Sequence, residues 1–171
     1  MEGRNVFEGR MPMRRTDREI VNRSEIIEII EKCDVCRLAF SDDNVPYIVP
    51  MNFGYEYENG KLTLYFHGAK EGKKLGIIDK NPVASFEMDC SHRLIGADEA
   101  CNFSMEYESV VGAGGIYICD EKFEKINALK HLMRKYDKDR DFDFPDDALE
   151  SITVFKLEVS EFSGKRLKKD M

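Results

Sequence analysis

The sequence YEYENGKLTLYFHGAKEGKKL, residues 55–75, determines much of the predicted fold. Asn59 and Gly60 separate two segments of β-forming residues, and this dipeptide favours a two-residue hairpin because both positions need a positive φ. The returning strand is expected over 62–67. Glycines and lysines then replace the apolar residues, and a short helix is predicted from Lys73.

Further strands are predicted on both sides of this hairpin. The candidate segments are rich in β-branched and aromatic residues and are bounded by turn residues. They are 36–40, 46–53, 83–90, 103–112, 116–119 and 152–159. Many short strands with few helices predict a mainly β fold, a small antiparallel barrel.

Three helices are predicted between the strands. The first begins at Ser24, or earlier near Thr16 or Asp17, and ends in the segment 33–36. The second covers 73–80 and stops because Pro82 disfavours helix in the residue before it. The third covers 120–136, with Asp120 as the expected N-cap and one apolar stripe. The stripe comprises Phe123, Ile126, Leu129, Leu132, Met133 and Tyr136. The acidic segment 137–147 is expected to be a loop.

Length and composition indicate one domain. The chain has 171 residues, a net charge of −7 and 42% hydrophobic residues, enough to bury a core. We expect an arm over 1–15 and the folded domain over 16–171. The acidic balance argues against nucleic-acid binding. No apolar stretch is long enough for a membrane span. With no secretory signal pattern, a cytoplasmic location is expected.

The segment 67–75 is a candidate anion-binding turn. It joins a strand end to a helix start, where free backbone N–H groups and the helix dipole favour a negative charge. Gly68 and Gly72 allow the backbone to approach a ligand closely. Residues 67–80 are locally positive, because Lys70, Lys73, Lys74 and Lys80 outnumber Glu71 and Asp79. A phosphate would suit it. A solvated basic turn is the alternative, because no consensus nucleotide loop is present.

Several motifs, in their order and spacing, resemble the flavin-binding split-barrel family of pyridoxamine 5′-phosphate oxidase. These motifs are CxxCRLAF from Cys33, NVPYIVPMNFGY from Asn44, LYFHGAKEGKKL from Leu64, NPVASFE from Asn81, YESVVGAG from Tyr107, the helix from Asp120 and FSGKR from Phe162. The similarity is greatest to the nitroimidazole-resistance (Nim-type) branch and covers roughly residues 11–167.

The resemblance implies an antiparallel split β-barrel of Greek-key type, a homodimer with FMN at its interface, and a set of cofactor-binding residues. Pro50, Met51 and Asn52 would follow the isoalloxazine edge. Phe66, His67, Gly68 and Ala69 would flank the ring and ribityl chain. Gly72, Lys73 and Lys74 would form the phosphate corner. Tyr107 and Ser109 would lie close to the flavin, with the partner protomer as one source.

The resemblance further implies an oxidoreductase that reduces a small, for example nitroaromatic, acceptor, with NAD(P)H as a candidate donor. A flavin- or haem-binding module without turnover and a pyridoxamine phosphate oxidase are the alternatives. The oxidase is disfavoured because the chain contains no Trp, whereas the oxidase carries a Trp-containing, Arg-rich C-terminal segment.

Single residues leave alternatives open. His67 is the candidate catalytic residue, as a hydrogen-bond or proton donor, or else a strand-end histidine. His92 and His131 are expected to be structural or solvated. Cys33 and Cys36 have metal-like or redox-like spacing, but packing is favoured because a second ligand pair is lacking, so no metal site is predicted. Asp98, Glu99, Glu106 and Glu108 are acid–base candidates or solvated strand residues.

Overall fold

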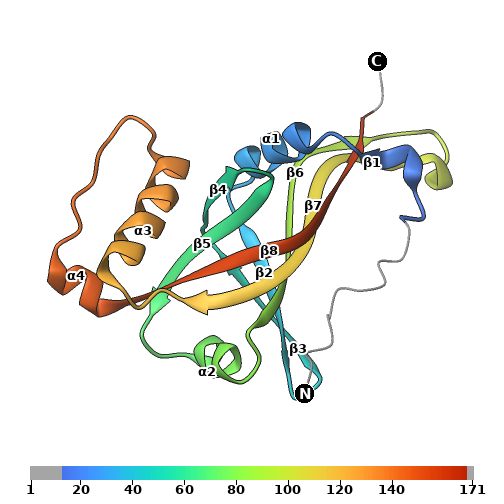
Figure 1. Cartoon of the computed structure of the whole chain (residues 1–171). Helices are drawn as coiled ribbons and strands as arrows, with labels where there is room; N and C mark the ends of the chain where they lie inside the picture. The colour runs from blue at the N-terminus through green and yellow to red at the C-terminus, as the bar shows by residue number, and fades with distance from the viewer. Residues whose placement is uncertain (1–12, 169–171) are drawn as a thin grey trace.

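The computed structural model describes residues 13–168, which form a curved antiparallel sheet with helices around it (Figure 1). The strands are β1 (Glu19–Ile20), β2 (Cys36–Asp42), β3 (Val45–Met51), β4 (Gly54–Glu58), β5 (Lys61–Ala69), β6 (Val83–Ile95), β7 (Ser104–Ile118) and β8 (Ile152–Leu167). The helices are η1 (Thr16–Arg18), α1 (Arg23–Lys32), α2 (Lys73–Lys80), η2 (Ala100–Asn102), α3 (Lys122–Tyr136) and α4 (Asp146–Ser151). The predicted split-barrel fold is confirmed.

The sheet curls until its two edges approach each other. Its order is β3-β2-β6-β7-β8-β5-β4, with β1 paired to β8, so β3 and β4 are the edges. The chain crosses from Met51 at one edge to Gly54 at the other through only two residues. A link of that length spans at most about 11 Å. The barrel is therefore split between β3 and β4. Pro46 and Pro50 fit β3 because an edge strand tolerates missing N–H donors.

The core fills the inside of the curl. Leu64, Phe66 and Phe155 are fully buried, and the two phenyl rings stack with centroids 5.4 Å apart. One face of α1 adds Ile29 and Ile30 to this core. Burying such side chains stabilises the fold by roughly 2 kcal/mol each. Alternation along β5 leaves His67 exposed on the opposite face from Phe66.

The local turn predictions hold. Asn59 and Gly60 have φ values of 52° and 80°, as the hairpin requires, and α2 covers the predicted residues. The helix predicted from Ser24 begins one residue earlier, because the Asn22 side chain accepts a hydrogen bond from the Ser24 N–H and caps it. The candidate start at Thr16 is only the short turn η1.

The two strands predicted over 103–112 and 116–119 are one strand, β7. Glycines allow this because β7 and β8 approach closely at a bulge between Ala113 and Gly114. A Cβ at position 114 would lie 2.0 Å from the backbone oxygen of Glu158. The glycines that suggested a break between two strands thus mark a close backbone contact between β7 and β8.

Three details of the α3 region differ from prediction. Asp120 does not cap α3, which begins at Lys122 after Glu121. Phe123, assigned to the apolar stripe, is 72% exposed, because the buried residues of α3 lie further along the helix, at Ala128, Leu129 and Leu132. The predicted acidic loop contains the start of α4, whose Leu149 is buried.

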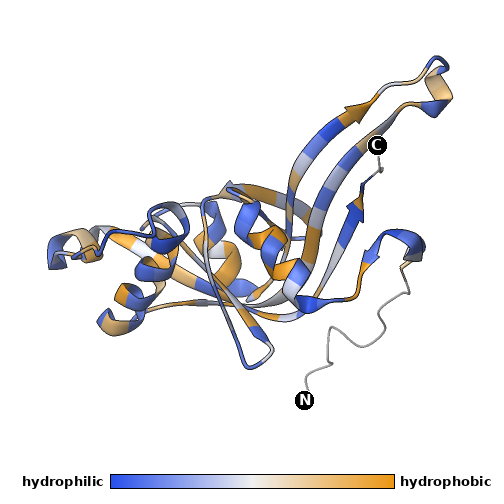
Figure 2. Cartoon of the chain, turned by 90° about the horizontal axis from the view of Figure 1, so that it is seen from above, coloured by the Kyte–Doolittle hydropathy of each residue, from blue (hydrophilic) through white to orange (hydrophobic). Residues whose placement is uncertain are grey.

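The hairpin formed by β6 and β7 extends beyond the body of the molecule (Figures 1 and 2). Its outer part carries Leu94, Phe103 and Met105, all exposed apolar side chains. The predicted arm lies mostly outside the described residues. Across residues 13–168, no helix combines the length and apolar character needed to cross a membrane.

Candidate functional site

A positive corner forms where β5 ends and α2 begins. Gly68 is opposite Thr153 of β8, and the Lys74 side chain folds back over it. A Cβ at position 68 would lie 3.0 Å from Lys74 Nζ. Gly72 precedes α2 with a φ of 144°, a conformation that favours glycine. The two glycines therefore let an ammonium group and the helix N-terminus face the same spot.

The first turn of α2 contains Lys73 and Lys74 and no acidic residue. Cations at a helix N-terminus oppose the helix dipole, which favours anions there. The charge of Lys73 is compensated by another part of the chain, because its Nζ lies 3.0 Å from an Asp42 carboxylate oxygen and 4.9 Å from the Tyr47 ring centroid. Lys74 lies instead over Gly68. The structure thus divides the predicted pair into one lysine tied to the β2–β3 hairpin and one at the corner.

The residues predicted to follow the ring edge lie at the split of the barrel. Pro50 and Asn52 are exposed, and Met51 is half-buried. The chain then bends away from the sheet, because Tyr136 at the end of α3 binds it. Asn52 Nδ2 and the Phe53 N–H donate to Tyr136 Oη over 3.1 and 3.2 Å.

Tyr136 is a residue that the sequence did not single out for the site. Its hydroxyl also donates to the backbone oxygen of Asp34 over 2.7 Å. One phenol therefore joins α3, the segment before β2 and the link between the sheet edges. The apolar stripe had assigned Tyr136 to the core, but the side chain is 44% exposed.

His67 lies between the corner and the split. His67 pairs with Val154 of β8. Along β5 it lies two residues after Tyr65, which pairs with Gly54 at the start of β4. Asn52 precedes the same pair by two residues. These two polar side chains therefore belong to the same end of the hairpin. Phe66 contributes only backbone there, because its ring is buried.

Tyr107 and Ser109 lie far from this region within one chain. Ile118 of β7 pairs with Phe155 of β8, and Phe155 pairs with Phe66 of β5, next to His67. Ser109 is nine residues earlier in β7, roughly 30 Å along the strand. Tyr107 is opposite Leu167, near the other end of the strand. A single protomer does not bring them to the corner.

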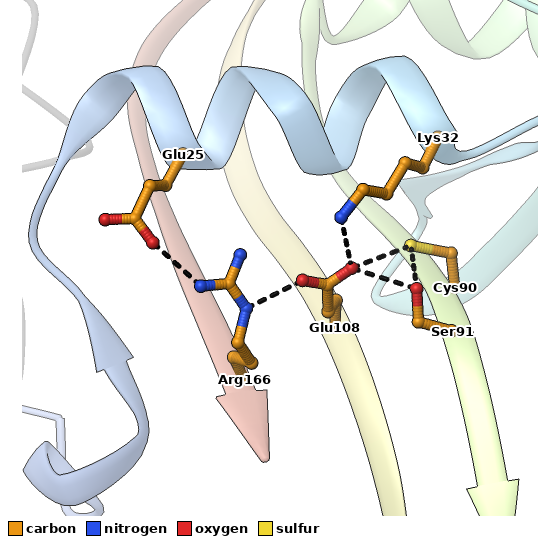
Figure 3. A network of polar contacts seen from close by, with 6 residues as sticks. All are labelled: Glu25, Lys32, Cys90, Ser91, Glu108 and Arg166. Carbon is orange, nitrogen blue, oxygen red and sulfur yellow. Dashed lines mark hydrogen bonds and ion pairs between the residues drawn. The ribbon is translucent and has the colours of Figure 1, made fainter. Parts of the chain in front are cut away.

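The acidic candidates on β7 form ion pairs rather than an open site (Figure 3). Glu108 is 8% exposed and accepts from Arg166 Nε at 2.6 Å, Lys32 Nζ at 2.8 Å and Ser91 Oγ at 2.9 Å. Arg166 also binds Glu25 of α1. Glu108 therefore clamps α1 to the sheet.

The remaining acidic candidates are Glu106, which is as buried as Glu108, and two exposed residues. Arg93 binds both carboxylate oxygens of buried Glu106. Asp98 and Glu99 are exposed beside η2.

The ion pairs of Glu108 lead to a prediction about how the stability of the fold depends on pH. Burial alone would raise the pKa of Glu108, but hydrogen bonds from Lys32, Arg166 and Ser91 outweigh it and lower the pKa to about 2. Stability from this group is thus present above the unfolded value of 4.5 and is lost as the pH falls toward 2. We expect Glu108→Gln to lower the unfolding free energy by about 2 kcal/mol at pH 7. Urea unfolding at pH 7 and pH 3 should show that difference shrinking in acid; an equal loss at both pH values would contradict it.

The cysteine spacing reflects packing. Cys33 and Cys36 are both fully buried, and burial raises the pKa of each thiol. Cys33 ends α1 and Cys36 begins β2. Within residues 13–168 there is no group of three His, Cys, Asp or Glu side chains that could hold a metal ion.

A hollow of about 570 Å³ lies on the outer face of β2, β3, β6, β7 and β8. Ile48 and Val111, two of its lining residues, are 60% and 46% exposed. Arg37, Glu87 and Glu161 place charges among the apolar groups. Pro50 is paired with Arg37, so this face continues to the split.

Comparison with known proteins identifies the relatives of the chain. A sequence model described as pyridoxamine 5′-phosphate oxidase matches residues 22–166. A candidate 5-nitroimidazole antibiotic resistance protein from Bacteroides thetaiotaomicron has a TM-score of 0.76 and 34% identity, with 86% of each chain covered. No curated protein matches the sequence.

Two more distant structures share the fold. The flavocytochrome Anf3 from Azotobacter vinelandii has a TM-score of 0.75 at 18% identity, covering 92% of this chain and 72% of the other. The FAD and heme binding protein from Mycobacterium smegmatis has a TM-score of 0.78 at 16% identity, covering 89% and 74%.

Proposed function

Because the chain belongs to the pyridoxamine 5′-phosphate oxidase family, we propose that it binds FMN and reduces a small aromatic acceptor, such as a nitro compound. The observation that carries this proposal is the corner at Gly68, where Lys74 lies beside the α2 N-terminus. A terminal phosphate of FMN is a dianion that suits an ammonium group and free backbone N–H groups. The similarity to a candidate 5-nitroimidazole resistance protein supports the choice of acceptor.

The chain's own groups would bind and orient the cofactor. Lys74 and the backbone from Gly72 would hold the phosphate, and Asp42 keeps Lys73 against the neighbouring hairpin. Asn52, fixed by Tyr136, would donate or accept hydrogen bonds at the ring edge. FMN would supply the electron chemistry. His67, exposed at the same end of the β4–β5 hairpin, is the proposed proton donor to the acceptor.

We propose a homodimer in which Tyr107 and Ser109 of one protomer reach the flavin of its partner. Two observations support this proposal. The hollow at Ile48 and Val111 exposes apolar surface on the sheet, and the projecting β6–β7 hairpin exposes Leu94, Phe103 and Met105. Apolar surface of this kind is typical of protein interfaces.

The cofactor itself is open to test, because the structural relatives include a flavocytochrome and an FAD and heme binding protein. The corner favours FMN, since the FAD diphosphate is a diester without a terminal dianion. Purified protein should therefore bind FMN more tightly than FAD or haem. Tighter binding of FAD or haem would contradict the assignment of Lys74.

The reaction is tested on FMN-loaded protein. NADPH or NADH added without oxygen should bleach the flavin band at about 450 nm, and a nitroaromatic compound should then restore it. In protein saturated with FMN, His67→Gln should slow the second step severalfold. Flavin that stays yellow with both donors would favour a non-catalytic carrier. Bleaching by pyridoxamine phosphate instead would favour the oxidase alternative.

A further inference from the structure

Helix α3 has the opposite charge sign to the chain as a whole. It contains five Lys or Arg residues and one Glu, a formal charge of +4, whereas the whole chain carries −7. Lys138 follows in the next segment. Lys130 and Arg134 are exposed on this helix. A concentration of one sign on a protein of the other sign attracts anions to that place.

A hollow of about 350 Å³ lies at the C-terminal half of α3, between this helix, α1 and β4. It is lined by Glu31, Tyr55, His131, Arg134, Lys135 and Lys138. The three cations exceed the single carboxylate, so the hollow carries a formal charge of +2 with His neutral. Glu31, the one carboxylate among these lining residues, accepts a hydrogen bond from Tyr55 Oη at 2.9 Å and binds Lys138. Arg134 forms no ion pair with Glu31.

Lys135 is a partly desolvated cation in this hollow. Its ammonium donates to the backbone oxygen of Glu31 rather than to a carboxylate and lies 5.2 Å from the Phe53 ring centroid. Burial lowers the pKa of Lys135. A cation with less water around it interacts more strongly with an incoming anion.

Two rings stand beside the cations. Tyr55 and His131 both line the hollow. Tyr55 is half-buried and fixed by its bond to Glu31, and Tyr65 stacks on one face of the His131 ring with centroids 5.1 Å apart. Such planar side chains suit a nucleobase, and the volume is that of a small-molecule site. Helix α1 and β4 supply the walls opposite α3.

We propose that this hollow binds the ADP group of a nucleotide, free or as part of a nicotinamide dinucleotide, with Arg134, Lys135 and Lys138 on its diphosphate. The site is separate from the corner at Lys74: it belongs to α3, α1 and β4, whereas the corner belongs to β5 and α2. This proposal does not depend on flavin binding at that corner.

The test is calorimetric titration of the protein, with and without saturating FMN, using ADP, NADPH and inorganic pyrophosphate as probes. ADP should bind in both conditions, and more tightly than pyrophosphate. Arg134→Ala, a change at an exposed side chain, should weaken ADP binding about tenfold. Lys61→Ala, at an exposed lysine of β5, is the matched control and should change it less than twofold. Tighter binding of ADP than of NADPH would identify a free nucleotide as the ligand, and tighter binding of NADPH would identify a nicotinamide dinucleotide.

Three results would overturn the proposal. One is the lack of measurable ADP binding at millimolar concentration. Another is equal affinity of Arg134→Ala and Lys61→Ala for ADP. The third is competition between ADP and FMN, which would place the nucleotide in the proposed flavin site. FMN affinity in Arg134→Ala should stay unchanged, so failure of the flavin proposal and failure of this one are distinguishable.

Discussion

Replacing Lys74 with alanine is expected to weaken FMN binding about a hundredfold, because a charge-assisted contact to phosphate is lost at a helix N-terminus. Lys73→Ala should weaken binding less, since the Lys73 ammonium lies 3.0 Å from an Asp42 carboxylate oxygen. The double variant should bind most weakly. Quenching of FMN fluorescence at several salt concentrations measures these affinities, and the salt dependence should fall with each lysine removed.

Lys80→Ala provides the control for the lysine series. Lys80 is an exposed lysine at the other end of the same helix, so its loss changes the net charge equally without touching the corner. Its effect should stay within twofold. An unchanged FMN affinity in the Lys73→Ala, Lys74→Ala double variant would remove the phosphate corner from the proposed function.

Gly54→Ala is expected to destabilise the fold by about 3 kcal/mol, the upper end for overpacking a tight contact. A Cβ at position 54 would lie 2.3 Å from the backbone nitrogen of Leu132 and 2.5 Å from the carbonyl carbon of His131. Both atoms are helix backbone, so no side-chain rotation relieves the clash. Helix α3 must move away from β4. Thermal unfolding followed by circular dichroism gives the loss.

The matched control is Gly76→Ala within α2. No heavy atom outside the helix lies within 4 Å of a Cβ at that position. Alanine has the higher helix propensity, so stability should be unchanged or should rise by up to about 1 kcal/mol. Equal stability of Gly54→Ala and the wild type would show that α3 does not sit against β4 as described.

The sequence predicted those features that local chemistry decides. Asn59 and Gly60 form the hairpin turn because few other residues adopt positive φ at two successive positions. Helix α2 lies where the glycines and Pro82 delimit it. The family resemblance, which rests on the order of several motifs, also identified the split barrel correctly.

Features that depend on contacts between distant segments were not predictable in this way. The glycines of β7 look like a strand break in sequence, but they fit a close approach to Glu158 of β8. Phe123 follows the helical period of the core face, yet the buried residues of α3 lie further along the helix. Glu108 resembles a solvated strand residue until Lys32 and Arg166, distant in sequence, close over it.

The amino-acid order alone thus determined the turns, the α2 boundaries, the strand-rich character and the cluster of lysines after β5. Only the tertiary structure decided that Lys73 binds Asp42 while Lys74 stays over Gly68, and that Tyr136 holds Asn52. The reason is physical. Backbone conformation responds to neighbouring residues, whereas the partner of a charged or hydroxyl group depends on which distant strands the sheet brings beside it.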